Sequence, residues 1–218
     1  MQRINAEVDF NFWETQFKKK IEQTQMENDP AHDLSHFYRV TSLAKTLAIQ
    51  EQAQLEVVVP AAWLHDLVNI PKNDPRRKLA SSLSATAACQ FLKEIQYPTT
   101  YLDDIGHAIQ THSFSANLPP LTLEAKVVQD ADRLDAIGAI GIARCFSVGG
   151  QLQRPLYSPV DPFAENRAAN DSENSLDHFF VKLLKLVESF QTHSGRIEGE
   201  RRLTSMKQFL AQLKTEIT

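Results

Sequence analysis

The stretch AAWLHDLVNIPKNDPRR, residues 61–77, carries the feature on which the interpretation of this chain depends. Two adjacent ionisable residues, His65 and Asp66, interrupt a run of apolar side chains that predicts a buried helix. An unpaired carboxylate is costly to bury, so Asp66 needs a partner in such a setting. That partner is either a hydrogen-bond donor or a metal ion.

Apolar residues recur every three or four positions along most of the chain, which is the spacing of amphipathic helices. The pattern predicts helices around residues 10–21, 40–48, 83–95, 101–109, 176–190 and 203–217. No run with the period-two alternation of a strand is found. We therefore expect an all-α fold.

Two details of this pattern are specific enough to check. In the helix around residues 83–95, the predicted buried stripe consists of Leu83, Ala87, Phe91 and Ile95. Pro60 precedes the doublet by five positions, and it either opens the helix that leads to the doublet or kinks it.

Composition limits the class of protein. The 218 residues carry a net charge of −4, which argues against a general nucleic-acid binder with a basic face. No apolar run is long enough to span a bilayer and no targeting signal is found near the start, so we expect a soluble, cytoplasmic protein. Cys89 and Cys145 are expected to be buried thiols rather than a disulfide.

Further candidate ligands for a metal ion stand in two other stretches of sequence. AHDLSHFYRV and VVQDADRLDAIGAIGIAR supply His32, His36, Asp130, Asp132 and Asp135. Asp132 and Asp135 share a helix face, whereas Asp130 points elsewhere. Asp130 and Asp135 also have a structural interpretation, as a helix cap or as partners of Arg133 or Arg144. Neutral imidazoles together with carboxylates form a mixed nitrogen and oxygen site for a divalent cation.

A single histidine, then a His-Asp doublet, then a distant aspartate resembles the HD-domain superfamily of metal-dependent phosphohydrolases. The chain looks like a bacterial branch that hydrolyses nucleotides. The resemblance extends over most of residues 31–190 and includes LDHFFVKLLKL, residues 176–186. It implies a single domain over residues 1–218, with an HD core at about 31–150 and C-terminal helices at about 175–217 packed on the core. The positions of the prolines independently predict a long irregular stretch at about 149–174.

Carried onto this sequence, the resemblance assigns the metal to His36, His65, Asp66 and Asp132. Asp132 is chosen because the family places its last ligand in an Ala-Asp-Arg-Leu context. Superfamily members with two metals carry further histidines after the doublet, and residues 67–106 contain none. We therefore expect one ion per chain, Mn²⁺ or Mg²⁺, with Fe, Co or Ni as alternatives.

Other residues receive supporting roles. Asp66 and His112 are the expected catalytic residues, with His112 beside the ion or in contact with substrate. His32, Asp33 and Asp135 are expected to orient the ligands, because ligating imidazoles usually need a second partner.

A phosphate chain needs cations beyond the metal ion. The expected substrate-binding residues are Lys72, Arg76, Arg77, Arg133 and Lys182. Lys126 and Arg144 are further candidates. The partner implied is a small-molecule nucleotide, with no nucleic acid and no membrane, and a homodimer remains open.

The resemblance implies hydrolysis of a nucleoside or deoxynucleoside triphosphate to a monophosphate and pyrophosphate. Two alternatives remain. The chain could be a phosphomonoesterase or phosphodiesterase that acts on nucleotide monophosphates or cyclic nucleotides, or a nucleotide-binding protein without turnover. Few Lys and Arg residues around the site would favour a cyclic nucleotide, because that substrate needs no pyrophosphate pocket.

Overall fold

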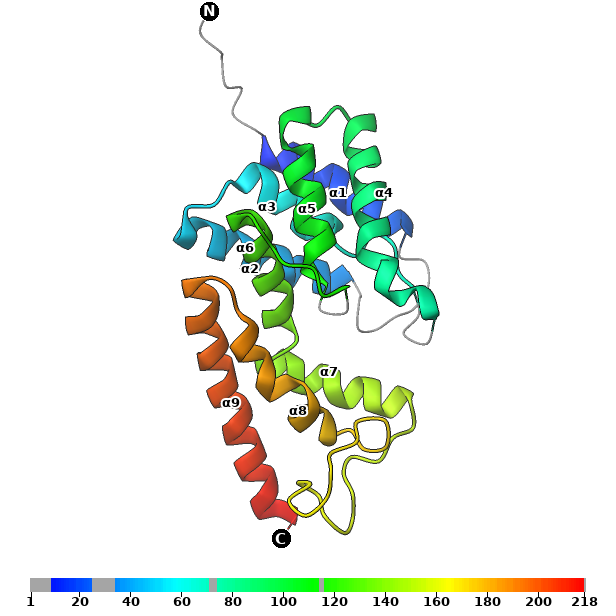
Figure 1. The fold of residues 1–218 in the computed structure, drawn as a ribbon, viewed down its shortest axis with the longest axis vertical. Coiled ribbons are helices and arrows are strands. Elements are labelled where there is room, and N and C mark those ends of the chain that lie inside the picture. The colour runs from blue at the N-terminus through cyan, green and yellow to red at the C-terminus, as the bar shows by residue number, and fades with distance from the viewer. Residues whose placement is uncertain (1–8, 25–33, 71–73, 114–115, 218) are drawn as a thin grey trace, which may run out of the picture.

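The computed structural model describes residues 9–24, 34–70, 74–113 and 116–217 (Figure 1). All regular structure in these residues is helical, as the apolar spacing predicts. In chain order the elements are α1 (Phe10–Thr24), α2 (Leu34–Glu51), α3 (Leu55–Leu64), the 3₁₀ helix η1 (Pro75–Leu79), α4 (Ala80–Glu94), η2 (Thr99–Tyr101), α5 (Leu102–His112), α6 (Leu123–Asp135), α7 (Gly138–Gln151), α8 (Asp177–Val181), η4 (Leu183–Ser189) and α9 (His193–Ile217).

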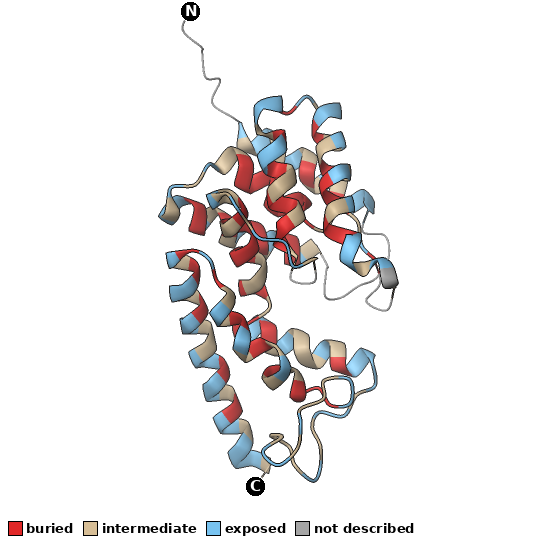
Figure 2. Ribbon diagram, in the orientation of Figure 1, coloured by how far each residue is buried: buried red, intermediate tan, exposed pale blue. Residues whose placement is uncertain are grey.

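Helix α6 joins two groups of helices (Figure 1). It packs against α2, α3 and α5 at one end of the molecule, and against α7 and α9 at the other. One cluster of buried apolar side chains extends from Phe17 in α1 to Leu210 in α9. Buried residues are concentrated along α2, α3, α5 and α6 (Figure 2), so the ends of these helices are held in fixed positions.

Helix α3 contains a proline in its interior. Every residue from Val57 to Leu64 is buried, including Pro60, which lies inside the helix rather than at its first turn. A proline has no backbone N–H, so the carbonyl of Glu56, four residues earlier, loses its helical partner. The Tyr97 hydroxyl donates a hydrogen bond to that carbonyl over 2.7 Å. The fold thus compensates for a proline that helix propensity would disfavour.

The predicted buried stripe of α4 is only partly correct: Ala87, Phe91 and the adjoining Ile95 are partly buried against the core, but they are not the most buried residues. Leu83 is 45% exposed, and the residues that the helix buries are Ala80, Ser81, Ser84, Ala85, Ala88 and Leu92. Small side chains permit the close packing of α4 on α5. At this contact a Cβ on Gly106 would come within 3.1 Å of the Cys89 sulfur. The close approach of α4 to α5 therefore favours burial of the face with small side chains over the face with larger ones.

The long irregular stretch lies between α7 and α8 and is fastened by Asp177, the first residue of α8. Asp177 accepts hydrogen bonds from Arg167 at 2.5 and 2.8 Å and from the Asn170 amide at 2.6 Å. Cys89 and Cys145 are free thiols, half-buried rather than fully buried. Among the described helices, none combines the length and the apolar character that crossing a membrane would require.

Candidate metal centre

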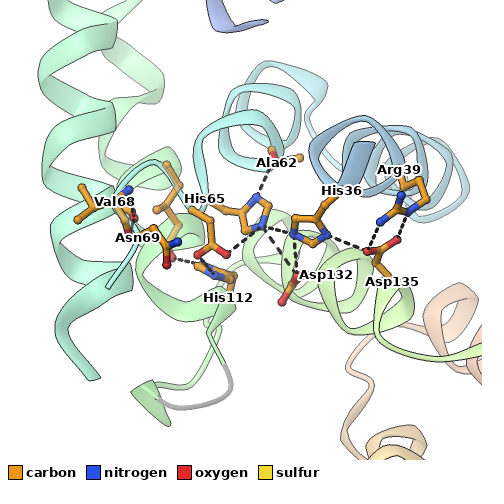
Figure 3. Close-up of polar contacts among 12 residues, drawn as sticks. His36, Arg39, Ala62, His65, Val68, Asn69, His112, Asp132 and Asp135 are labelled. Carbon is orange, nitrogen blue, oxygen red and sulfur yellow. Dashed lines mark hydrogen bonds and ion pairs between the residues drawn. The ribbon is translucent and has the colours of Figure 1, made fainter. Parts of the chain in front are cut away.

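Five chemically active side chains meet where four helices end or begin (Figure 3). His36 lies in the first turn of α2, His112 is the last residue of α5, and Asp132 lies in the last turn of α6. His65 is the residue that follows α3, and Asp66 continues into the turn beyond it. The doublet therefore terminates the buried helix rather than lying within it.

The distances within this cluster fit a single ion. His36 Nε2 lies 3.2 Å from His65 Nε2, and Asp132 Oδ1 lies 3.6 and 3.8 Å from these two atoms. Asp66 Oδ2 lies 3.9 Å from His65 Nε2. Ligands about 2.1 Å from one ion are separated by about 3.0 Å at a right angle and about 4.2 Å when opposite. One ligand atom each from His36, His65 and Asp66 falls within 4.8 Å of the others.

Hydrogen bonds on the far side of each ring select which nitrogen faces the cluster. His65 Nδ1 lies 2.8 Å from the Ala62 carbonyl, and His36 Nδ1 lies 2.8 Å from Asp135 Oδ2. Such an oxygen accepts a hydrogen bond from Nδ1–H, so in its neutral form each ring presents an unprotonated Nε2. Two such nitrogens facing each other at 3.2 Å cannot hydrogen-bond to one another. A cation between them would satisfy both, so the donor set fits a metal.

The protonation states also fit metal ligation. Burial lowers the pKa of His65 to about 4, with the nearby Asp66 carboxylate only partly opposing it. Burial raises the pKa of Asp132, but His65, His112 and His36 more than offset this effect and hold it below the usual value. At neutral pH the His65 imidazole is therefore neutral and the Asp132 carboxylate is ionised, and these are the forms that bind metal.

His112 differs from His65 because it retains a proton more readily. Its Nδ1 lies 2.6 Å from the Ile109 carbonyl, and its Nε2 lies 3.4 Å from Asp66 Oδ1. Burial lowers the pKa of His112, but the hydrogen bond to Asp66 and the charge of Asp66 raise it by more, so the net shift of this pKa is upward. His112 and Asp66 therefore form a pair that can hold a proton beside the cluster.

Asp135 is the buried partner of His36 and is itself held by two arginines. Arg39 donates to it from Nε at 2.6 Å and from Nη2 at 3.1 Å, and Arg144 Nη1 donates at 2.6 Å. Burial raises the pKa of Asp135, but the His36 and Arg39 hydrogen bonds dominate and hold it well below its usual range. Arg39 escaped the sequence interpretation. Its place three residues after His36, on the same helix face, is the signal that could have revealed it.

Asp130 lies on the opposite side of α6 and has a structural role. It accepts hydrogen bonds from the Gln191 amide at 2.9 Å, and from the amide and hydroxyl of Thr192 at 2.8 and 2.7 Å. These contacts fix the backbone directly before α9. The structural interpretation of Asp130 is confirmed, although it holds the backbone that precedes α9 and does not cap a helix end.

Two of the expected substrate-binding cations are engaged away from the cluster. Arg76 pairs with Asp74 at 2.8 Å, and its side chain is 72% exposed. Arg77 donates to the Ile70 carbonyl at 2.6 Å and so fastens the chain that follows the doublet. The structure does not bring either guanidinium to the other site residues.

The remaining cations divide between two pockets. Arg133 donates to the Ser189 carbonyl at 2.6 Å and lines an open pocket together with Lys78. Lys182 lines a second pocket together with Arg144. The predicted roles of His32, Asp33 and Lys72 concern positions outside the described residues.

Comparison with known proteins gives the family. The HD domain family matches residues 33–137. YpgQ of Bacillus subtilis is 34% identical over 206 residues, which cover 93% of this chain and 92% of YpgQ. The crystal structure of YpgQ in complex with ADP aligns with a TM-score of 0.71 at 33% identity, over 93% of each chain.

A second solved structure carries a functional description. It is that of an HD-superfamily hydrolase from Bacillus thuringiensis, which aligns with a TM-score of 0.70 at 30% identity, over 93% of this chain and 97% of that one. With the doublet, the all-helical fold and the site geometry, these matches show that the chain belongs to the HD superfamily and is an HD-superfamily hydrolase.

Proposed function

We propose that this chain hydrolyses nucleotides, converting a nucleoside or deoxynucleoside triphosphate to a monophosphate and pyrophosphate with the help of one divalent ion. The observation that carries the proposal is the convergence of His36, His65, Asp66 and Asp132, with both imidazoles presenting Nε2 to one point. The complex of the relative YpgQ with ADP supports a nucleotide as the ligand.

His36, His65, Asp66 and Asp132 would hold the ion. The two carboxylate oxygens, with further positions open to water or phosphate oxygens, suit Mn²⁺ or Mg²⁺, because these ions favour oxygen ligands. When bound, such an ion supplies Lewis acidity toward a phosphoryl oxygen and lowers the pKa of water.

The residues of the chain then perform the remaining tasks. Asp135 and the Ala62 carbonyl hold the His36 and His65 rings in the orientation that exposes Nε2. His112, whose pKa Asp66 raises, can carry a proton at Nε2 and donate it to the oxygen that leaves. Asp66, 3.4 Å from that nitrogen, keeps the proton in place until transfer.

The test is a metal analysis paired with a substrate screen. The protein is loaded with Mn²⁺ or Mg²⁺ and assayed for phosphate and pyrophosphate with triphosphates, monophosphates and cyclic nucleotides. We expect pyrophosphate release from triphosphates alone, and loss of both metal and release in Asp66→Ala. The exposed Asp103→Ala serves as a matched control and should retain both.

Other outcomes would identify the alternatives. Phosphate release from monophosphates, or opening of a cyclic nucleotide, would replace the proposed reaction by an esterase activity. Metal and nucleotide binding without release of either product would indicate a nucleotide-binding protein that does not turn over.

A further inference from the structure

A second site adjoins the metal cluster, on the far side of Asp135. It is a pocket of about 340 Å³ lined by α7, by the loop that follows it, and by the segment 178–183. Arg144 belongs both to this pocket and to the cluster, because it donates to the Asp135 oxygen that His36 Nδ1 also contacts. Two contacts, of 2.6 and 2.8 Å, therefore connect the pocket wall to His36.

The pocket is rich in positive charge. Arg144, Arg154 and Lys182 line it, Asp171 is the acidic residue among the described lining residues, and Arg144 also pairs with Asp135 of the cluster. The Asp171 carboxylate lies 2.7 Å from Nδ1 of His178, which also lines the pocket. At neutral pH these three cations outnumber the carboxylates of Asp171 and Asp135, so the pocket has the chemistry of an anion site.

The rest of the lining is mostly apolar. Val148, Leu152 and Leu183 form part of the walls. Such walls reduce the screening of charge by water, so each cation attracts an anion more strongly than it would on an open surface.

We propose that this pocket binds the phosphate chain of the nucleotide, with Arg144, Arg154 and Lys182 contacting its oxygens. The inference rests on the proposed function, which supplies the nucleotide as ligand. An Arg guanidinium matches two phosphate oxygens at once, and a Lys ammonium adds a point charge. The subsite is distinct from the cations after the doublet, because Arg76 and Arg77 do not line this pocket and contact Asp74 and the Ile70 carbonyl instead.

The pocket can be tested without turnover by calorimetric titration of inorganic tripolyphosphate into metal-free protein with a chelator present. Lys182→Gln and Arg154→Gln remove one charge each and keep Arg144, the pocket residue that donates to Asp135. We expect each to weaken tripolyphosphate binding about tenfold or more, the usual effect of losing one charge-assisted pair. Lys185→Gln, which removes an exposed lysine from the same segment, should change binding less than about twofold.

Two results would overturn the inference. One is equal tripolyphosphate affinity in wild type and both pocket variants. The other is a loss of affinity for adenosine instead of tripolyphosphate, which would make the pocket a base site. Thermal unfolding of each variant verifies the fold. If no nucleotide is hydrolysed but the pocket variants still bind tripolyphosphate more weakly than wild type, the proposed reaction is refuted and the anion site is supported.

Discussion

His36 Nδ1 lies 2.8 Å from Asp135 Oδ2, so the carboxylate determines which nitrogen of the ring faces the other ligands. Asp135→Asn tests this relationship. The new amide can donate to His36 Nδ1 and so drive the ring proton to Nε2, where it would compete with a metal ion. We expect metal affinity to fall about 10- to 100-fold, as is typical when such a partner is lost. Titration with Mn²⁺ measures it, and unchanged affinity would contradict the assignment.

Asp130→Asn provides the matched comparison on the same helix. Asp130 is as buried as Asp135, but its carboxylate accepts hydrogen bonds from the backbone amides of Gln191 and Thr192. In the variant the new NH₂ group faces backbone N–H groups that also donate, so a hydrogen bond is lost. We therefore expect the free energy of unfolding to fall by about 1–3 kcal/mol. Metal affinity should stay within about twofold. Chemical denaturation and Mn²⁺ titration separate the two effects, and a loss of metal here would contradict the division of roles.

Local pattern explains why much of the site could be predicted from the sequence. Helix spacing places Asp132 and Asp135 on one face of α6 and Asp130 on another, and this is how the structure arranges them. The resemblance to a known family contributed His36 and the doublet. These assignments need only the period of a helix and the order of motifs along the chain.

What the sequence could not supply are contacts between distant segments. The Tyr97 bond to Glu56 spans 41 residues, and the Arg39 bond to Asp135 spans 96. The buried face of α4 depended on how closely α5 approaches it. Each is decided by tertiary packing, which apolar periodicity does not encode.

The pH dependence of stability follows from His65. Its pKa is about 4 in the folded protein against 6.5 when unperturbed, so between these values only the unfolded chain binds the proton. Stability of the metal-free protein should therefore fall as pH falls from 6.5 toward 5, by up to about 1.4 kcal/mol per pH unit from this group. Urea unfolding at several pH values measures the slope.

His65→Gln isolates that contribution, because the variant keeps the other titrating groups. His112 acts in the opposite direction: its raised pKa adds stability at low pH that is lost as pH rises through the folded pKa. The low pKa of Asp135 matters only below this window. The difference in unfolding free energy between wild type and variant should shrink toward pH 5. Parallel curves would refute the assignment.

The hydroxyl of Tyr97 replaces the hydrogen bond that Pro60 cannot give to the Glu56 carbonyl. Tyr97→Phe should therefore leave a partly buried carbonyl without this partner and cost about 1–3 kcal/mol of unfolding free energy. In a Pro60→Ala background the backbone N–H of residue 60 can donate a hydrogen bond to the Glu56 carbonyl. Tyr97→Phe should then lower the free energy of unfolding clearly less. Denaturation of the four proteins in this double-mutant cycle gives the coupling energy. Equal costs in both backgrounds would mean that the tyrosine acts through packing alone.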